Sequence, residues 1–171
     1  LAPSEMCIRD RTNREDAKIV INNELKTLII EFLDNKNIDF KILDNSFTLY
    51  LNNYLKGYWQ GSTSKINWSK VCGNSLLIDF KDNIDHDIVQ KSLINANFKV
   101  LKSNYLVLYF SGNEAVFRIH KTFFTNYLYD FMDEFAFLDS ILLFDYEQAI
   151  SKTSEINFVE VRILDYIAGN N

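Results

Sequence analysis

The chain has 171 residues and a mass of 20.0 kDa, the size of one domain with a substantial core. Hydrophobic residues make up 47% of it and charged residues 24%, which excludes a disordered chain, a collagen and a disulfide scaffold. The formal net charge of −5 predicts no general attraction to nucleic acid, and the lack of a long apolar run predicts no helix that spans a membrane.

The first eleven residues differ in composition from the rest. They hold the only proline, Pro3, and one of the two cysteines, Cys7. Because residues 1–11 resemble the translation of a sequencing adapter, we expect them to be an artefact, and residues 12–171 to form a single α+β domain shortened at its N-terminus. Without Cys7, Cys72 has no partner for an internal disulfide, which favours a reducing, cytoplasmic location.

Three helices are predicted from apolar residues that recur at every third or fourth position. Two of these helices are long, over residues 12–36 and 121–138. Asp85 is typical of an N-cap and begins a shorter predicted helix over residues 85–95. The inner stripe of the second long helix consists of Phe124, Leu128, Phe131, Phe135 and Leu138.

Strands are predicted where apolar and polar residues alternate. In the last of them we expect Val159 and Val161 to face the core, and Glu160 and Arg162 to face solvent. Hairpins outnumber βαβ units, so the predicted fold class is α+β, a mainly antiparallel sheet with helices on one face. The sequence predicts hairpins over 38–51 and 98–110 and single strands over 75–80, 115–119, 141–146 and 158–164.

Residues 122–151 contain six carboxylates and no Lys, Arg or His. On the predicted helix, Asp130, Asp133 and Glu134 lie opposite the apolar stripe, with Phe137 on the same side. Three interpretations compete: a solvated helix face, a metal site, and a docking surface for a basic protein. No spacing typical of a metal-binding motif is present, so we expect no metal.

An irregular stretch with several aromatic residues includes Tyr58 and Trp59. Rings on a loop either cover the core or supply the hot spots of a binding site. Lysines between the rings would also suit nucleic acid, but the net acidity argues against that partner. Both alternatives stay open, and within the docking hypothesis Tyr58 and Trp59 form a second patch of the protein-docking surface.

A small basic group is predicted where a strand meets the second long helix. Arg118, His120 and Lys121 form a candidate anion site there, although strand alternation alone would make Arg118 and His120 simply solvent-facing. The remaining reactive side chains have plainer explanations. His86 fits a solvated helix start, and Cys72 fits a buried, inert thiol.

No catalytic residue and no cofactor is predicted, because the chain lacks a dinucleotide fingerprint, a phosphate-binding loop and a nucleophile elbow. We expect a binding protein rather than an enzyme. By analogy of class with bacterial immunity proteins, it would mask or recruit a basic protein. The alternative is a small enzyme acting on an anionic substrate through His120, Arg118 and Lys121. The residues expected to bind the partner are Asp130, Asp133, Glu134, Phe137, Tyr58 and Trp59.

Overall fold

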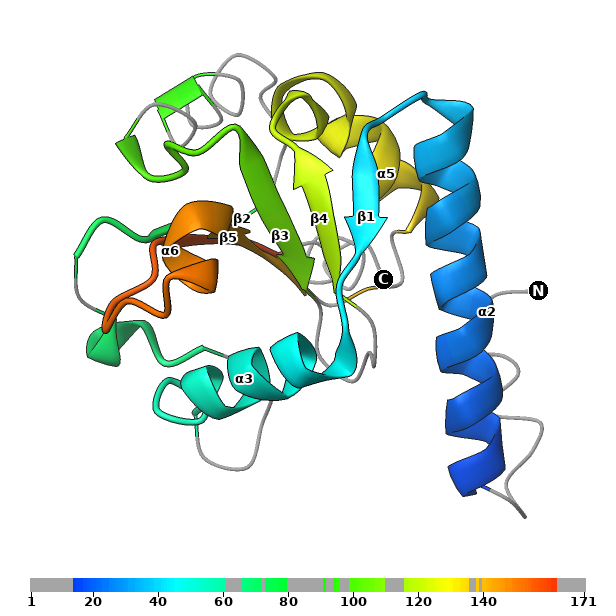
Figure 1. Cartoon of the computed structure of the whole chain (residues 1–171), viewed down its shortest axis with the longest axis horizontal. Coiled ribbons are helices and arrows are strands. Elements are labelled where there is room, and N and C mark those ends of the chain that lie inside the picture. The colour runs from blue at the N-terminus through cyan, green and yellow to red at the C-terminus, as the bar shows by residue number, and fades with distance from the viewer. Residues whose placement is uncertain are drawn as a thin grey trace.

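A six-stranded sheet of order β1-β4-β3-β5-β6-β2 forms the centre of the computed structural model (Figure 1). The structure describes residues 14–60, 66–71, 73–79, 91, 94–95, 99–109, 116–135, 138 and 140–162. The strands are β1 (Phe40–Ile42), β2 (Leu76–Asp79), β3 (Tyr105–Tyr109), β4 (Phe117–His120), β5 (Ser140–Asp145) and β6 (Phe158–Arg162). The helices are α2 (Arg14–Asn35), α3 (Asn45–Leu55), α5 (Leu128–Glu134) and α6 (Tyr146–Ile150), with the short turns η1 (Trp68–Lys70) and η2 (Phe123–Tyr127). The predicted α+β class is confirmed.

The sheet is mostly antiparallel, as predicted. Neighbouring strands run antiparallel in every described pair except β2 and β6, which are parallel. The predicted second hairpin is misplaced, because residues 99–102 form no strand. Its second half, β3, pairs instead with β4, so that Tyr105 lies opposite His120.

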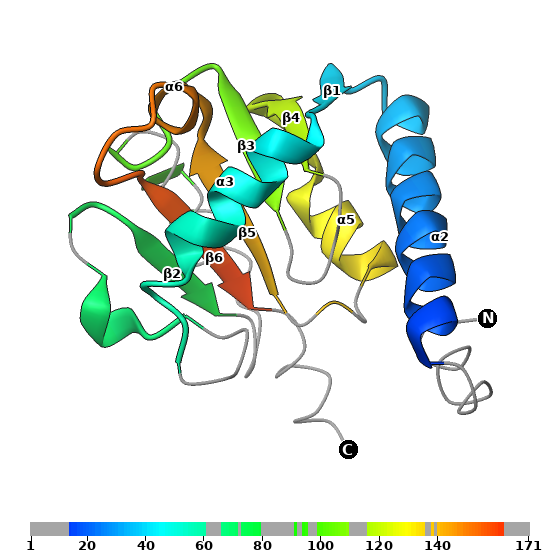
Figure 2. The same cartoon turned by 60° about the horizontal axis from the view of Figure 1, so that its bottom comes forward.

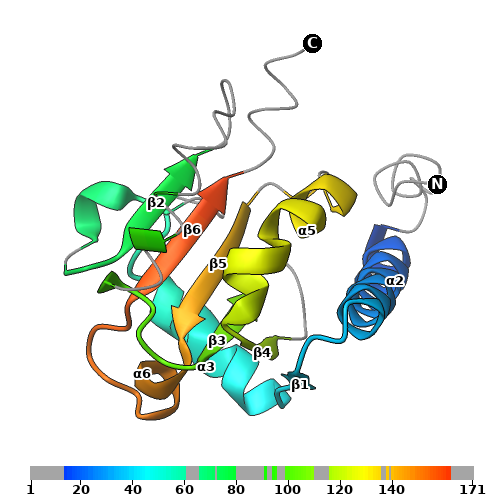
Figure 3. The same ribbon diagram turned by 90° about the horizontal axis from the view of Figure 1, so that it is seen from above.

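Helices cover both faces of the sheet, which corrects the prediction that they cover one. Figure 3 shows α3 and α6 on one side of the sheet and α5 on the other, with α2 beyond the β1 edge. We call the two sides the α3 face and the α5 face. Each face has its own core cluster. On the α3 face, Leu51 and Leu55 of α3 pack with Phe144 and Phe158. On the α5 face, α2 and α5 pack with the strand residues that point to the opposite side of the sheet.

The covering of both faces explains why the last strand was misread. A strand between two helical layers is buried on both sides, so alternation no longer separates core from solvent. Val159 and Val161 lie in the core as predicted, but Glu160 is only 2% exposed and Arg162 is half-buried. Phe158 shares a face with Glu160 and also lies in the core.

The first predicted long helix corresponds to α2, which ends one residue before the predicted boundary. Its predicted start at Thr12 lies outside the described residues. The helix ends in a Schellman motif, in which the Ile38 N–H donates to the Leu33 carbonyl and the Asn37 N–H to that of Asp34, at 3.0 Å each. Asn37 takes the left-handed conformation that this motif requires, with φ of 55°.

The second half of the predicted first hairpin is the helix α3, so that prediction was wrong. Asp44 caps this helix by accepting a hydrogen bond from the Phe47 N–H at 3.0 Å. Thr48, Leu51 and Leu55 are buried, a spacing of three and four residues, while Leu49 is 62% exposed. Figure 2 shows α3 lying across the sheet.

The second long helix is shorter than the predicted range 121–138: it consists of η2, a π-helical turn, followed by α5, which ends at Glu134. Four stripe residues are buried as predicted: Phe124, Leu128, Phe131 and Phe135. Of the predicted helix over 85–95 the structure describes only Lys91, Ile94 and Asn95, and all three are helical.

Candidate functional site

The acidic face predicted on the second long helix lies on α5 and points away from the sheet. Asp130, Asp133 and Glu134 are exposed, opposite the buried residues Leu128 and Phe131. We call these three carboxylates the acidic face. Phe137, predicted beside them, lies outside the described residues.

One cation reaches this acidic face. Lys36 Nζ lies 3.5 Å from Asp130 Oδ2, and both side chains are substantially solvated. The Lys36 ammonium also lies 5.8 Å from the centre of the Phe32 ring, and that ring meets Phe131 of α5 edge-on with the centroids 5.4 Å apart. Within the described residues, Asp133 and Glu134 have no ion-pair partner.

Tyr58 and Trp59 lie on the α3 face, so the sheet separates them from the acidic face. Both rings are half-buried and pack against the core cluster beneath α3. The Tyr58 centroid lies 5.4 Å from that of Tyr54 and 6.2 Å from that of Phe158. The two predicted patches therefore do not form one surface, and these rings cover the core.

The basic group is partly assembled on the α3 face. Arg118 and His120 of β4 flank Tyr105 of the neighbouring strand β3: the Arg118 guanidinium carbon lies 4.4 Å from the centre of that ring, and the His120 ring meets it edge-on at 5.4 Å. Lys121 follows the end of β4, and its backbone N–H donates to the Asn104 carbonyl at 2.9 Å.

Asp39 adds a carboxylate to this group. The Tyr105 hydroxyl donates to Asp39 Oδ2 at 2.7 Å, and the Arg118 terminal nitrogen lies 4.0 Å from Asp39 Oδ1. This hydrogen bond is the main reason that the pKa of the Tyr105 hydroxyl is raised. The Thr122 N–H donates to His120 Nδ1 at 3.2 Å, which in the neutral ring places the proton on Nε2.

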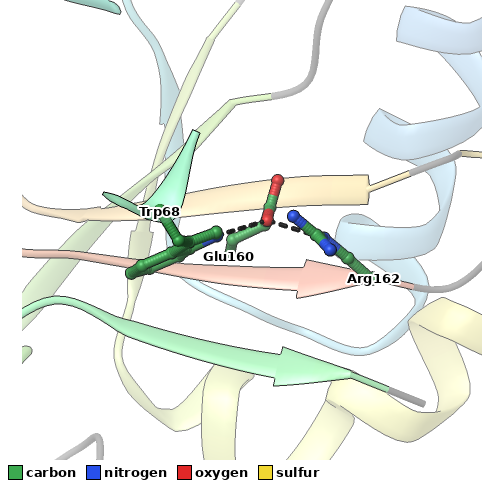
Figure 4. A network of polar contacts seen from close by, with 3 residues as sticks. All are labelled: Trp68, Glu160 and Arg162. Atoms are coloured by element: carbon green, nitrogen blue, oxygen red, sulfur yellow. Dashed lines mark hydrogen bonds and ion pairs between the residues drawn. The ribbon is translucent and has the colours of Figure 1, made fainter. Parts of the chain in front are cut away.

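A buried carboxylate on β6, that of Glu160, was not predicted. Glu160 Oε1 accepts two hydrogen bonds of 2.9 Å, one from the Trp68 indole N–H and one from Arg162 Nε (Figure 4). Phe158 was the available signal, because an aromatic residue on the same side of the strand indicates that this side is buried too. Both donors converge on one oxygen, so the arrangement links η1 to the sheet.

Asp145, one of the six acids of the cation-free segment, is also structural. It is 3% exposed and accepts hydrogen bonds from the backbone of Lys102, Ser103 and Gln148 and from the Ser103 hydroxyl. These bonds cap α6 and hold residues 102–103 against it. The negative charge of this segment is therefore only partly available to a partner.

Three further expectations concern metals, membranes and reactive side chains. Among the described residues, no three His, Cys, Asp or Glu side chains gather where they could hold a metal ion. None of the helices described is both long and apolar enough to cross a membrane. Cys72 and His86 lie outside the described residues.

Comparison with known proteins identifies no relative: no family model, no curated protein and no solved structure matches the chain.

Proposed function

We propose that this protein binds a basic protein through the acidic face of α5, and masks or recruits that partner much as a bacterial immunity protein does. The carrying observation is that Asp133 and Glu134 are exposed with no cation beside them in the described structure. Like charges three and four residues apart on a helix repel one another. A partner's lysines or arginines would relieve that repulsion.

Further features support this proposal. Two more exposed carboxylates, Glu31 and Asp34, lie on the neighbouring helix α2 and extend the negative potential. Beneath the acidic face, the rings of Phe131 and Phe135 contact each other in the core, with their centroids 4.6 Å apart. The carboxylates are therefore held on a well-packed helix, which reduces the ordering cost of binding.

The proposed surface is smaller than the sequence indicated. Tyr58 and Trp59 lie on the other face of the sheet, so they are not part of it. Phe137 stays a prediction from the sequence as its apolar anchor, since that residue lies outside the described structure and α5 ends at Glu134.

The test compares two matched double variants. Asp133→Asn with Glu134→Gln neutralises the acidic face, whereas Glu147→Gln with Glu155→Gln removes the same charge from two exposed sites elsewhere. Each exposed ion pair between a carboxylate of this chain and a cation of the partner contributes up to about 1 kcal/mol of binding free energy, or about fivefold in affinity. We therefore expect the first variant to weaken binding by up to roughly thirtyfold, and the second to change it little.

The partner is first captured by the wild-type chain, then purified and identified. Its dissociation constant is measured by calorimetry for the wild type and both variants at two salt concentrations. Binding of the wild type should weaken as salt rises, and this dependence should be smaller for the acidic-face variant. Equal effects of the two double variants, or capture of an acidic partner whose binding ignores salt, would refute the proposal.

A further inference from the structure

The side chain of Arg118 makes no hydrogen bond within the described structure. It is 25% exposed, and its Nε atom is completely buried without a partner. The nearest carboxylate oxygen, on Asp39, is 4.0 Å away, which is too far for a hydrogen bond. A buried N–H donor without an acceptor is unfavourable, and for Arg118 that donor is Nε, whereas its terminal nitrogens share the 25% exposure of the side chain.

Two rings hold this guanidinium in place. Its central carbon lies 4.4 Å from the ring centre of Tyr105 and 5.9 Å from that of Tyr146, the first residue of α6. The two rings meet at 6.2 Å in an edge-on arrangement. Such packing orients the planar fork of donors before any ligand arrives.

Two cations, Lys41 and Arg118, meet on this face, with Asp39 beside Arg118 and Asp44 close enough to interact with Lys41. Lys41 of β1 lies directly opposite Arg118 in the antiparallel pair, so the two side chains project from the same face. Like charges in that position repel each other. Asp39 is the carboxylate in contact with Arg118, and it already accepts the hydrogen bond of Tyr105. His120 offers its Nε2–H nearby, since Nδ1 is engaged by Thr122.

We propose that Arg118 binds a small oxyanion, a phosphate or carboxylate group, on the α3 face of β4, with Lys41 and His120 beside it. Two oxygens of such an anion match the guanidinium fork, and its charge offsets the repulsion between Lys41 and Arg118. Within the described structure Arg118 contacts Tyr105, Tyr146 and Asp39 but not Lys121, so Lys121 is not part of this site. The site lies on the opposite side of the sheet from the acidic face and does not depend on the proposed function.

The site is tested by NMR on the full chain. Sodium phosphate and sodium acetate are titrated in separate arms to about 10 mM, which would fill a site with a dissociation constant of about 1 mM to about nine-tenths. Sodium chloride at the same ionic strength serves as the reference. The His120 imidazole signals and the backbone amides of β1 and β4 are followed. We expect saturable shifts in at least one oxyanion arm and none with chloride, and the arm that saturates identifies the ligand class.

Three variants locate the binding. Arg118→Lys keeps the charge but loses the fork, so affinity should fall about fivefold or more. Lys41→Gln changes an exposed side chain and should also weaken binding, which keeps the test valid if the first variant unfolds. Lys152→Gln is the control, because Lys152 also lies over a tyrosine ring, that of Tyr50 at 5.1 Å, but far from β4 in sequence. Linear, chloride-like shifts, or equal affinity in the wild type and the Arg118 or Lys41 variant, would overturn the proposal.

Discussion

Replacing Glu160 by glutamine removes a buried negative charge while keeping the acceptor oxygen in place. The wild-type carboxylate is 2% exposed, and one of its oxygens receives both the Trp68 and the Arg162 hydrogen bond. The Gln amide can still accept both bonds through its oxygen. The substitution therefore isolates the contribution of charge from that of shape.

The size of the effect follows from the two donors. A hydrogen bond to a charged group contributes about 1.5–3 kcal/mol and a neutral one about 0.5–1.5 kcal/mol, so neutralising Glu160 weakens each bond by about 1 kcal/mol. Glutamine avoids the desolvation cost of a carboxylate, and Arg162, at 27% exposure, keeps part of its hydration. We expect Glu160→Gln to lower the free energy of unfolding by about 1–2 kcal/mol. Glu160→Ala also leaves the Trp68 donor unpaired and should cost about 3 kcal/mol.

The assay is urea denaturation at neutral pH, followed by far-ultraviolet circular dichroism because Trp68 would itself alter the fluorescence. Trp68→Phe removes the indole N–H and keeps a ring against Phe158, whose centroid lies 5.5 Å away. A double-mutant cycle of Trp68→Phe with Glu160→Gln should show a coupling of about 1 kcal/mol. Stability of Glu160→Gln within about 0.5 kcal/mol of the wild type, together with no coupling, would show that this network does not hold η1 to the sheet.

Two further predictions concern pH and backbone conformation. Burial raises the pKa of Tyr109 to about 12 in the folded state, above the usual 10.0. The stability that the protonated Tyr109 contributes is therefore complete below about pH 10 and is lost as the pH rises through 12. In urea denaturation, the free energy of unfolding of Tyr109→Phe should fall less steeply over this alkaline range than that of the wild type. Equal falls in the two proteins would contradict the prediction. At the end of α2, Asn37→Ala should lower the free energy of unfolding by about 1 kcal/mol, because φ is 55° at this position. Asn37→Gly should not lower it, since glycine adopts positive φ freely. Equal free energies of unfolding for the two variants would show that the left-handed conformation is not required.

The sequence correctly predicted the elements in which the spacing of apolar residues fits only one kind of secondary structure. The helical segment made of η2 and α5 is one example, since Phe124, Leu128, Phe131 and Phe135 fit a helix and not a strand. The segment from Phe47 to Leu51 fits both periods, and the strand interpretation was wrong. Asp44 is what distinguishes them, because its side chain caps the helix.

The candidate sites depended on facts that no local pattern contains. The sequence identified Asp133 and Glu134 as exposed acids because helical periodicity places them opposite the core. It could not show that the sheet separates them from Tyr58 and Trp59, since that requires the strand order. The burial of Glu160 was missed for the same reason, because it depends on a second helical layer.

The parallel pairing of β2 with β6 also constrains how the chain can fold during synthesis. Leu76 pairs with Val159, more than eighty residues further along, whereas β3, β4 and β5 are joined by much closer connections. When the ribosome releases β2, its partner strand has not yet been made. The strand that carries the apolar residues Leu76 and Ile78 therefore stays unpaired until β6 has left the ribosome. The need for β6 thus leaves this apolar segment exposed to chaperones and to other chains for longer than the pairs among β3, β4 and β5 leave theirs.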